Sequence, residues 1–340
     1  MDNGSSGARG AFRRTARASD GLAPSVATAV ALRKPLRLAM ALAASLALLA
    51  FVACGGDAPP PAALPTATPP PVPSPTPEAT GLHVAMAVGD LSVGKNRFAF
   101  ALIDPQSGPL RDAQVKLSTF FLAGMGPGEP RETVASRFRK WPVSAGGVYT
   151  AQLMFDTAGD WEIDIEVVGP GALTRTISLG LRIAEDSATP AIGSPAPRSV
   201  SRTAGEVAGL EEITSDLNPD PEMYAMSVAD AIDAGMPVLV TFSTPAYCTS
   251  ATCGPQLDVV KDLRRRYRDR MNFIHVEIYD NPSEIQGDLS RARISPVVTE
   301  WNLPSEPWAF VVDSDGLLHA KFEGFTTSEE LEEALVSVLE

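Results

Sequence analysis

The sequence predicts two folded domains, an all-β sandwich followed by an α/β domain. Three observations lead to this fold class. Short alternating apolar runs fill residues 81–184, apolar strands alternate with helical patterns over residues 206–340, and ten prolines crowd residues 58–80 before them. Regularly spaced short strands are typical of a sandwich, and alternating β and α patterns of an α/β domain. Residues 185–205, rich in Ser, Ala, Pro and Gly, are expected to form the linker between the two domains.

Residues 1–53 have the features of a leader and a signal peptide. Basic residues precede an uncharged run from Leu38 to Ala53, which is shorter than the ~20 apolar residues of a membrane-spanning helix. The run ends at Cys54 in the sequence ACGG, which resembles the lipobox of bacterial lipoproteins, with Phe51 where leucine is usual. That resemblance implies lipidation of Cys54 and a lipid anchor on the extracytoplasmic face of the cell membrane. An ordinary cleaved signal peptide and an uncleaved anchor are the alternatives.

The rest of the chain is acidic, and it begins with a proline-rich stretch. After residue 53 there are 21 Lys and Arg against 39 Asp and Glu, a net charge of −18. Nucleic-acid binding needs a basic surface, so we expect no nucleic-acid partner. Residues 54–80 are expected to form a stalk, because a proline-rich chain favours the extended polyproline conformation, with a reach of roughly 70 Å here. A linker without a geometric role is the alternative.

Short strands are expected throughout residues 81–184. The apolar runs are LHVAMAV, RFAFALI, AQVKLSTFF, ETVASRF, VYTAQLMF, WEIDIEVV and RTISLGLRI, and turn sequences such as DPQSG and AGG separate them. About seven strands over ~100 residues predict an immunoglobulin-like sandwich. The order of VGKNRFAFALIDPQSGPLRDAQVKL and GGVYTAQLMFDTAGDWEIDIEV resembles the YtkA-like exported domains.

Some members of that group handle copper, which draws attention to three residues of this domain. His83, Met86 and Met125 carry the imidazole and thioether groups that suit copper. His83 and Met86 stand three residues apart on an expected strand, so their side chains should point to opposite faces. Met125 lies in a Gly-rich loop with no His beside it. We therefore expect core and loop filling from these side chains, and no metal site.

The elements of the α/β domain follow in order. A short helix is expected between a start at Ser227 and Asp230 and a stop at Gly235. The buried strand PVLVTF comes next, followed by the amphipathic helix PQLDVVKDLRRRYRDR. The strands NFIHVEIYD, WAFVVD and LLHAKFEG complete the sheet, and a capping box of Thr327 and Glu330 starts the last helix.

Cys248 and Cys253 follow the first of these strands, in the sequence CTSATC. A helix N-terminus stabilises a thiolate through its free amides and dipole, and four intervening residues allow the ~5.5 Å Cα separation of a disulfide. Pro255 suits the first turn of a helix, so Cys253 should lie at the helix start and Cys248 in the loop before it. We expect Cys248 to be the attacking thiol and Cys253 the resolving one.

The order of elements, with cysteine at the first strand-to-helix junction, resembles the thioredoxin fold over residues 222–340. The sequence SEPWAFVVDSDG matches the family segment in which a proline is cis and packs against the redox pair, which implies this role for Pro307. The resemblance implies a thiol-disulfide oxidoreductase that acts on protein clients with disulfides and needs no cofactor. The chain departs from the family in its four residues between the cysteines, in Thr241 where many members bury a carboxylate, and in Glu306 before the proline. The sequence CGP beginning at Cys253 echoes the family motif and keeps the reverse assignment of the two thiols open.

Two other interpretations of the cysteine pair stay open. The Sco-type copper chaperones use a spaced cysteine pair and a distant His on the same fold, and on that resemblance Cys248, Cys253 and His319 would hold copper. His275 is expected to belong to the sheet itself. A structural disulfide in a non-catalytic binding domain is the third interpretation. A disulfide stabilises a protein mainly by lowering the entropy of the unfolded chain, and a loop of only six residues lowers it little.

Overall fold

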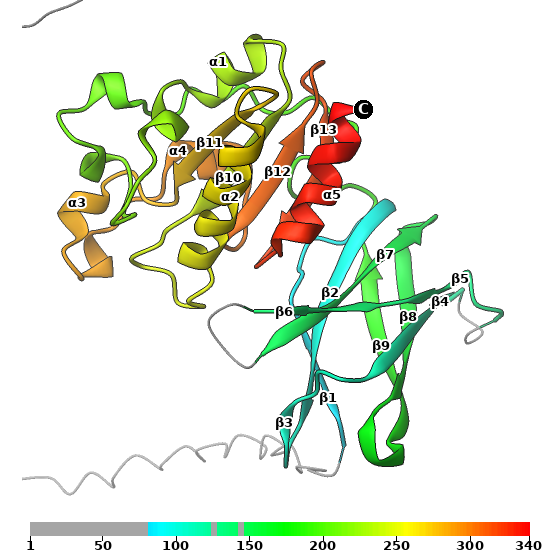
Figure 1. Ribbon diagram of the computed structural model, residues 1–340. Helices are drawn as coiled ribbons and strands as arrows, with labels where there is room; N and C mark the ends of the chain where they lie inside the picture. Colours follow the sequence, from blue (N-terminus) through cyan, green and yellow to red (C-terminus); the bar gives the residue numbers. More distant parts are fainter. Residues whose placement is uncertain (1–80, 124–127, 142–145) are drawn as a thin grey trace, which may run out of the picture. The chain divides into compact units, whose positions relative to one another are not determined.

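The computed structural model describes residues 81–123, 128–141 and 146–340 (Figure 1). The leader, Cys54, the proline-rich stretch and Met125 lie outside the described residues. All described residues belong to one compact unit. Among them there is no helix whose length and apolar character would let it cross a membrane.

The N-terminal half of the described chain forms two antiparallel sheets. The first sheet has the order β1 (His83–Met86), β2 (Gly94–Asp104), β7 (Gly147–Phe155) and β6 (Arg137–Lys140), with β3 (Gly108–Pro109) paired to β2. The second has the order β5 (Glu132–Ala135), β4 (Gln114–Phe121), β8 (Gly159–Val168) and β9 (Thr174–Ile183). One apolar core draws on both sheets, with large aromatic side chains at its centre: Phe98, Phe100, Tyr149, Phe155 and Trp161.

Each apolar run that predicts a strand in this region contains one, and the run ETVASRF contains two. Its first half, β5, pairs with β4 in the second sheet, whereas its second half, β6, pairs with β7 in the first sheet. The chain changes sheets at Ser136, whose backbone N–H still donates to the carbonyl of Val115 at 2.9 Å. A bend of this kind lets one segment serve both layers of a two-sheet structure.

The C-terminal half contains a mixed sheet with helices on both faces. Its strand order is β11 (Asn272–Glu277), β10 (Val238–Ser243), β12 (Trp308–Val312) and β13 (Leu318–Glu323). β10 and β11 run parallel, while β12 and β13 are antiparallel to their neighbours. The α-helices are α1 (Val228–Asp233), α2 (Cys253–Tyr267), α3 (Pro282–Ile285), α4 (Pro296–Glu300) and α5 (Ser328–Leu339). This arrangement is thioredoxin-like, as the sequence predicts for residues 222–340.

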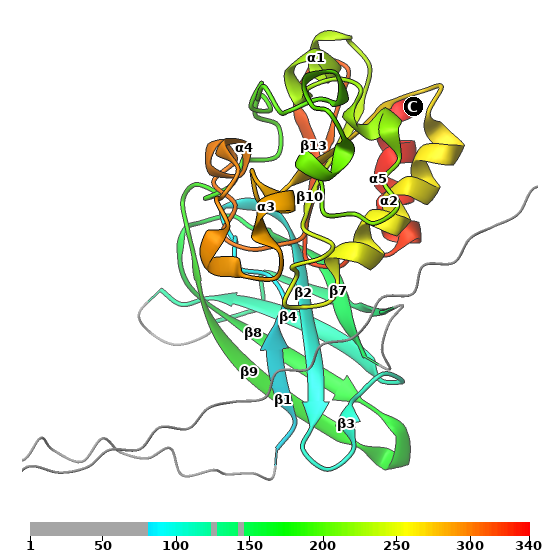
Figure 2. The same ribbon diagram turned by 90° about the vertical axis from the view of Figure 1, so that its left-hand side faces the viewer.

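Alternation along the buried strand β10 divides the apolar side chains between two cores. Val240 belongs to the core beneath α1 and α4, whereas Leu239 belongs to the core beneath α2 and α5. Figure 2 shows α2 and α5 on one side of this sheet and α4 on the other. Burial of both faces explains why the strand sequence is apolar nearly throughout.

Short 3-10 helices occupy the connections. They are η1 (Pro170–Ala172), η2 (Ala204–Glu206), η3 (Leu210–Glu212), η4 (Pro221–Tyr224) and η5 (Leu289–Arg291). Residues 185–205, expected to be a linker, pack against the thioredoxin-like half. Ser199 accepts a bond from Ala229 N and another from Trp301 Nε1, and Ala196 N donates to Gly316 O.

One of the two expected helix caps forms in full and the other in half. α1 starts at Ser227 as expected, and Ser227 and Asp230 form a reciprocal capping box there. Thr327 caps α5 by accepting from the backbone N–H of Glu330, but the Glu330 carboxylate does not return to Thr327. It binds Arg97 of β2 instead. The predicted capping box at α5 is therefore wrong in its second half, because a buried ion pair binds a carboxylate more strongly than one neutral backbone amide does.

This ion pair belongs to a contact between β2 and the thioredoxin-like half. Residues 96–100 are all buried, although every second side chain of β2 points away from the core between the two sheets. Arg97 and Ala99 are on that outward face, and Arg97 also donates to the carbonyl of Glu323 at the end of β13.

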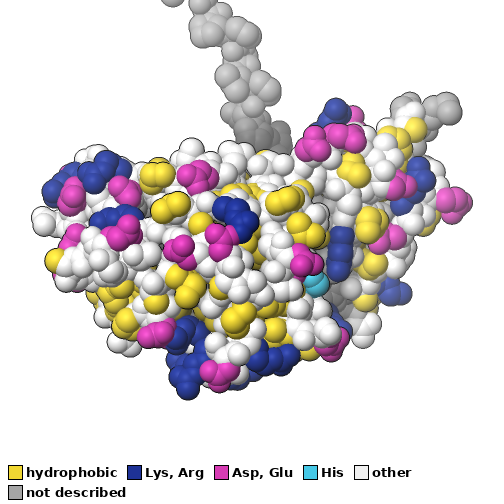
Figure 3. Space-filling view, turned by 90° about the horizontal axis from the view of Figure 1, so that it is seen from above, with side chains coloured by type: hydrophobic (Ala, Val, Ile, Leu, Met, Phe, Trp, Pro, Cys, Tyr) yellow, Lys and Arg dark blue, Asp and Glu magenta, His cyan; other side chains and the backbone are white. Residues whose placement is uncertain are grey.

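On the face shown in Figure 3, Lys and Arg side chains occur in small groups beside Asp and Glu.

Candidate redox site

Cys248 and Cys253 form a disulfide, with their Cα atoms 6.0 Å apart. Cys248 lies in the loop that follows β10 and is half-buried. Cys253 is the first residue of α2, and its side chain is fully buried. The two sulfurs therefore differ in access, because only Cys248 can be reached from solvent.

The loop between the cysteines is held by its own hydroxyl groups. Ser250 Oγ lies 3.2 Å from Cys248 Sγ and 2.7 Å from the hydroxyl oxygen of Thr252. Ala251 takes a left-handed conformation with φ of +56°, which is uncommon for a residue with a side chain. Before the loop, the Tyr247 hydroxyl donates to the carbonyl of Pro282 at 3.0 Å.

The start of α2 is suited to a thiolate. Thr252 occupies the N-cap position but its side chain makes no capping bond, and the first turn contains no acidic residue. The free backbone N–H groups of this turn are therefore not neutralised by a neighbouring carboxylate within the helix. Such groups, together with the helix dipole, lower the pKa of a cysteine thiol at a helix start.

Glu306 lies beside the disulfide and, together with Pro307, directly precedes β12. The Glu306–Pro307 peptide bond is cis. One carboxylate oxygen of Glu306 and the two cysteine sulfurs all lie within 4.8 Å of one another. Burial, with a smaller contribution from the negative charge of Glu277, raises the pKa of Glu306 to about 7. Near neutral pH this carboxyl group is therefore present in both its protonated and its ionised form.

A second buried carboxyl group lies behind this one. Glu277 ends β11 and accepts bonds from both the backbone N–H and the hydroxyl of Ser215, each at 2.7 Å. Burial raises the pKa of Glu277 despite these bonds. Thr241, where the family often buries a carboxylate, donates its hydroxyl to the carbonyl of Trp308. The carboxyl group beside the disulfide is thus that of Glu306, just before β12, and not one at position 241.

Sequence reasoning noted Glu306 as a departure from the family pattern and did not notice Glu277. A signal for Glu277 exists in the strand NFIHVEIYD, where one glutamate interrupts an otherwise buried run. Buried acidic side chains are rare unless they are paired or functional.

The candidate third metal ligand is elsewhere. His319 is exposed on β13, and its Nε2 lies 2.7 Å from the hydroxyl of Ser337 in α5. In the described part of the chain, the group of three possible ligands that the structure brings together is Cys248, Cys253 and Glu306. His83 lies on β1 and belongs to no such group of His, Cys, Asp and Glu side chains within the same residues, and Met86 lies on the same strand.

His275 belongs to the sheet, as expected. It lies on β11, with Nδ1 2.7 Å from the Tyr224 hydroxyl and Nε2 2.9 Å from the Ser243 hydroxyl. Burial lowers the pKa of His275 to about 4, so the ring is neutral at physiological pH. Its partners occupy both ring nitrogens, which leaves neither one available to a metal.

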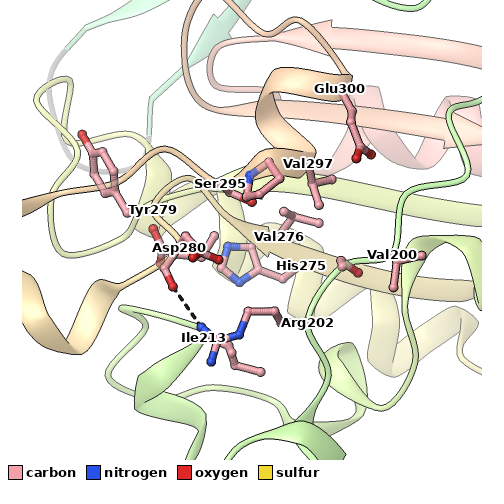
Figure 4. Close-up of a pocket in the computed structure, with 13 residues that line it drawn as sticks. Val200, Arg202, Ile213, His275, Val276, Tyr279, Asp280, Ser295, Val297 and Glu300 are labelled. Carbon is pink, nitrogen blue, oxygen red and sulfur yellow. Dashed lines mark hydrogen bonds between the residues drawn. The ribbon is translucent and has the colours of Figure 1, made fainter.

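His275 also lines a small pocket of about 100 Å³. Figure 4 shows Arg202 reaching across this pocket to the backbone carbonyl of Asp280, a bond of 2.9 Å. Neither cysteine of the disulfide lines the pocket, and neither does Glu306. We assign it to the packing of residues 200–213 on the edge of the sheet.

Comparisons with known proteins agree with parts of this description. Residues 76–166 match the model of a family described as YtkA-like, which confirms the resemblance found in the sequence over about a quarter of the chain. No curated protein matches the chain.

Among solved structures, one described as a thiol:disulfide interchange protein DsbE of Chlorobium tepidum is 13% identical, with 45% of this chain and 100% of that chain covered and a TM-score of 0.33. StoA of Bacillus subtilis is 15% identical, with 30% and 83% covered and a TM-score of 0.24. A DUF4426 family protein of Pseudomonas aeruginosa is 17% identical, with 31% and 90% covered and a TM-score of 0.23. These scores are low, so the fold assignment rests on the strand order and cores described above.

Proposed function

We propose that this chain is an extracytoplasmic, membrane-tethered thiol-disulfide oxidoreductase that acts on protein clients through Cys248 and Cys253. One observation carries the proposal: an accessible sulfur and a buried sulfur are paired at the start of a helix, beside a carboxyl group whose pKa is about 7. A purely structural disulfide needs neither unequal access nor a proton acceptor.

The reaction is an exchange of disulfides. In the reduced protein, the Cys248 thiolate attacks one sulfur of a client disulfide, a new Cys248–client bond forms, and the other client sulfur leaves as a thiolate. The Cys253 thiol then gives its proton to Glu306, and its sulfur attacks Cys248 Sγ. The bond between Cys248 and the client breaks, and the client leaves as a second thiolate. The client disulfide is reduced by two electrons, and the cysteine pair is oxidised to the disulfide.

Single cysteine variants test this assignment. Cys253→Ser should trap a mixed disulfide between Cys248 and a client, whereas Cys248→Ser should abolish exchange. Trapping is measured by non-reducing electrophoresis and mass spectrometry of the joined peptides. If the Cys248→Ser variant traps clients instead, the roles are reversed. If small dithiols cannot reduce the disulfide of the folded protein, the pair is structural and the proposal fails.

The tether is part of the proposal and rests on the sequence around Cys54. Replacing Cys54 by Ser should release the protein from the membrane fraction without changing its thermal unfolding. The matched control is Ser45→Ala in the preceding apolar run, which should leave the protein in the membrane. A Cys54→Ser variant that stays in the membrane would instead indicate an uncleaved anchor.

Copper binding is the alternative considered for the same pair, and the structure favours it less. The Sco-type arrangement needs a His as third ligand, but the third group beside the cysteines is the carboxyl of Glu306. Carboxylate oxygen suits harder cations than copper, which prefers thiolate and imidazole. Free-thiol counts with and without a copper chelator, together with metal analysis of the purified protein, separate the two functions. Copper bound one to one would overturn the redox proposal.

A further inference from the structure

A cleft of about 370 Å³ opens beside the disulfide loop, between that loop and the sandwich half of the described unit. The thioredoxin-like half supplies one wall: Ser250, Thr252, Ser305, Glu306 and Phe325. The sandwich supplies the other wall, which is mostly apolar: Met86, Ala87, Val88, Ala99 and Val148.

Two short distances connect the reactive sulfur to this cleft. Cys248 Sγ lies 3.2 Å from Ser250 Oγ, and Ser250 is a lining residue. Glu306, which also lines the cleft, has its carboxylate within 4.8 Å of both sulfurs. A polypeptide joined to Cys248 through its own cysteine therefore has its neighbouring residues at the mouth of this cleft.

The two walls are held together by hydrogen bonds and a buried ion pair. The carboxylate of Glu323 accepts from the backbone N–H of Gly89 at 2.6 Å and from the hydroxyl of Ser305, also at 2.6 Å. These bonds fasten the segment after β1 to the loop that precedes Glu306. Arg97 and Glu330 fasten β2 to α5. The apolar wall is thus a fixed part of the site's surroundings and does not have to move into place.

We infer that this cleft binds the apolar residues that flank the reactive cysteine of a client polypeptide. The inference rests on the proposed function, because it is the exchange at Cys248 that places the client chain here. The occupant is an extended segment with apolar side chains next to its cysteine. Cysteine is among the most buried residue types, so such a segment is accessible mainly in a client that is incompletely folded.

The composition of the walls supports this occupant. Met86 is a flexible, polarisable side chain that is 36% exposed, and methionine adapts to side chains of different shape. Two carboxyl groups, those of Glu306 and Glu323, lie at the polar side of the cleft. Acidic residues next to the client cysteine would meet these groups, so acidic segments should be the poorest clients.

The test compares two variants of exposed methionines on the sandwich. Met86→Asp places a charge in the cleft, and Met154→Asp places the same charge on β7, where Met154 is 52% exposed and does not line the cleft. Each variant is assayed with three substrates. The first is a disulfide-linked peptide whose cysteines have Leu and Val as neighbours (the apolar peptide), the second is the same peptide with Ser at these neighbouring positions, and the third is dithiothreitol. Met86→Asp should lower kcat/KM for the apolar peptide about tenfold and change the other two rates less than twofold. Met154→Asp should change none of the three.

Equal loss with all three substrates, or equal loss in both variants, would overturn the inference. A second measurement separates it from the proposed function. The apolar peptide with Ser in place of Cys, titrated against the oxidised protein, should bind more weakly to Met86→Asp than to wild type. If this peptide binds but dithiothreitol cannot reduce the disulfide, the oxidoreductase proposal fails and the client-binding role of the cleft stands. If dithiothreitol reduces the disulfide but the apolar peptide is not preferred, the client-binding role fails and the oxidoreductase proposal stands.

Discussion

Arg97 of β2 and Glu330 of α5 form a bidentate ion pair with both side chains almost completely buried. The distances are 2.8 Å from Nε to Oε1 and 3.0 Å from Nη2 to Oε2, and the side chains are 5% and 7% exposed. Arg97 also donates to the carbonyl oxygens of Glu323 and Phe325. The guanidinium group therefore has acceptors on several sides, all from the thioredoxin-like half of the chain.

Replacing Glu330 by Ala should destabilise the protein by about 3–5 kcal/mol. The variant leaves the Arg97 charge buried without its counter-charge, which is far more costly than losing an ion pair in water. Urea unfolding of the residues after the stalk measures the change. Glu333→Ala is the matched control on the same helix, because Glu333 pairs with Arg137 at the surface and its loss should cost about 0.5 kcal/mol or less. Equal losses in the two variants would show that the buried pair adds nothing.

Much of the fold could be predicted because its signals are local. The alternation of β2, the doubly buried β10 and the Ser227 cap each depend on neighbouring residues in the sequence. The exchange of sheets at Ser136 was not predictable, because both halves of that run alternate in the same way and only pairing partners distinguish them. The partner of Glu330 was missed for a similar reason: Arg97 is 233 residues away, and a sequence pattern contains no information on such a contact.

For the site, the cysteine spacing and Pro255 predict that Cys253 begins the helix and that Cys248 precedes it, which is where the structure places them. The surroundings were less predictable. The position of Glu306 before the expected cis-proline predicts a carboxylate near the cysteine pair, whereas the burial that raises its pKa depends on tertiary contacts. Glu277 lies more than twenty residues after Cys253, and burial of its carboxyl group is a tertiary property.

Ala251→Gly should stabilise the oxidised protein by up to about 1 kcal/mol. Ala251 has φ of +56°, a region that costs an L-residue about 1–2 kcal/mol and that glycine enters freely. Part of the gain is lost because glycine has more freedom in the unfolded chain. Ala246→Gly in the same loop is the control: its φ is not positive, so only the loss should remain. Thermal unfolding without reductant gives both values, and a lower melting temperature for Ala251→Gly would contradict the prediction.

Stability should fall in acid because of His275. Its pKa is lowered by burial from an ordinary 6.5 to about 4, so the unfolded chain takes up a proton on this residue before the folded chain does. The stabilisation is fully present above pH 6.5 and is lost as the pH falls towards 4. His275→Gln should remove this part of the pH dependence, whereas His319→Gln, at an exposed position, should keep it. Urea unfolding at half-unit steps from pH 4 to 7.5 measures the slope, and an unchanged slope in His275→Gln would exclude the buried ring as its source.

The rate of disulfide exchange should rise as the pH increases through about 7, because of Glu306. The pKa of this carboxyl group is raised to about 7, chiefly by burial, so the carboxylate that accepts a proton from Cys253 predominates only above that pH. Glu306→Gln cannot accept the proton, and its rate at pH 8 should be lower by roughly a hundredfold. The remaining rise in the variant should follow the thiol alone, at a higher pH. Stopped-flow measurement of thiol release from pH 5.5 to 9 gives the two profiles.

A second readout distinguishes proton transfer by Glu306 from a merely structural role. A carboxyl group with a raised pKa stabilises the folded state at low pH, and this contribution is lost as the pH rises through about 7. Glu306→Gln should therefore be more stable than wild type above pH 7, even though its exchange is slower. The control is Glu300→Gln, at the exposed last residue of α4, which should change neither the rate profile nor the stability. If Glu306→Gln were both slower and less stable above pH 7, the carboxyl group would be acting through the local structure, and proton transfer from Cys253 would need another acceptor.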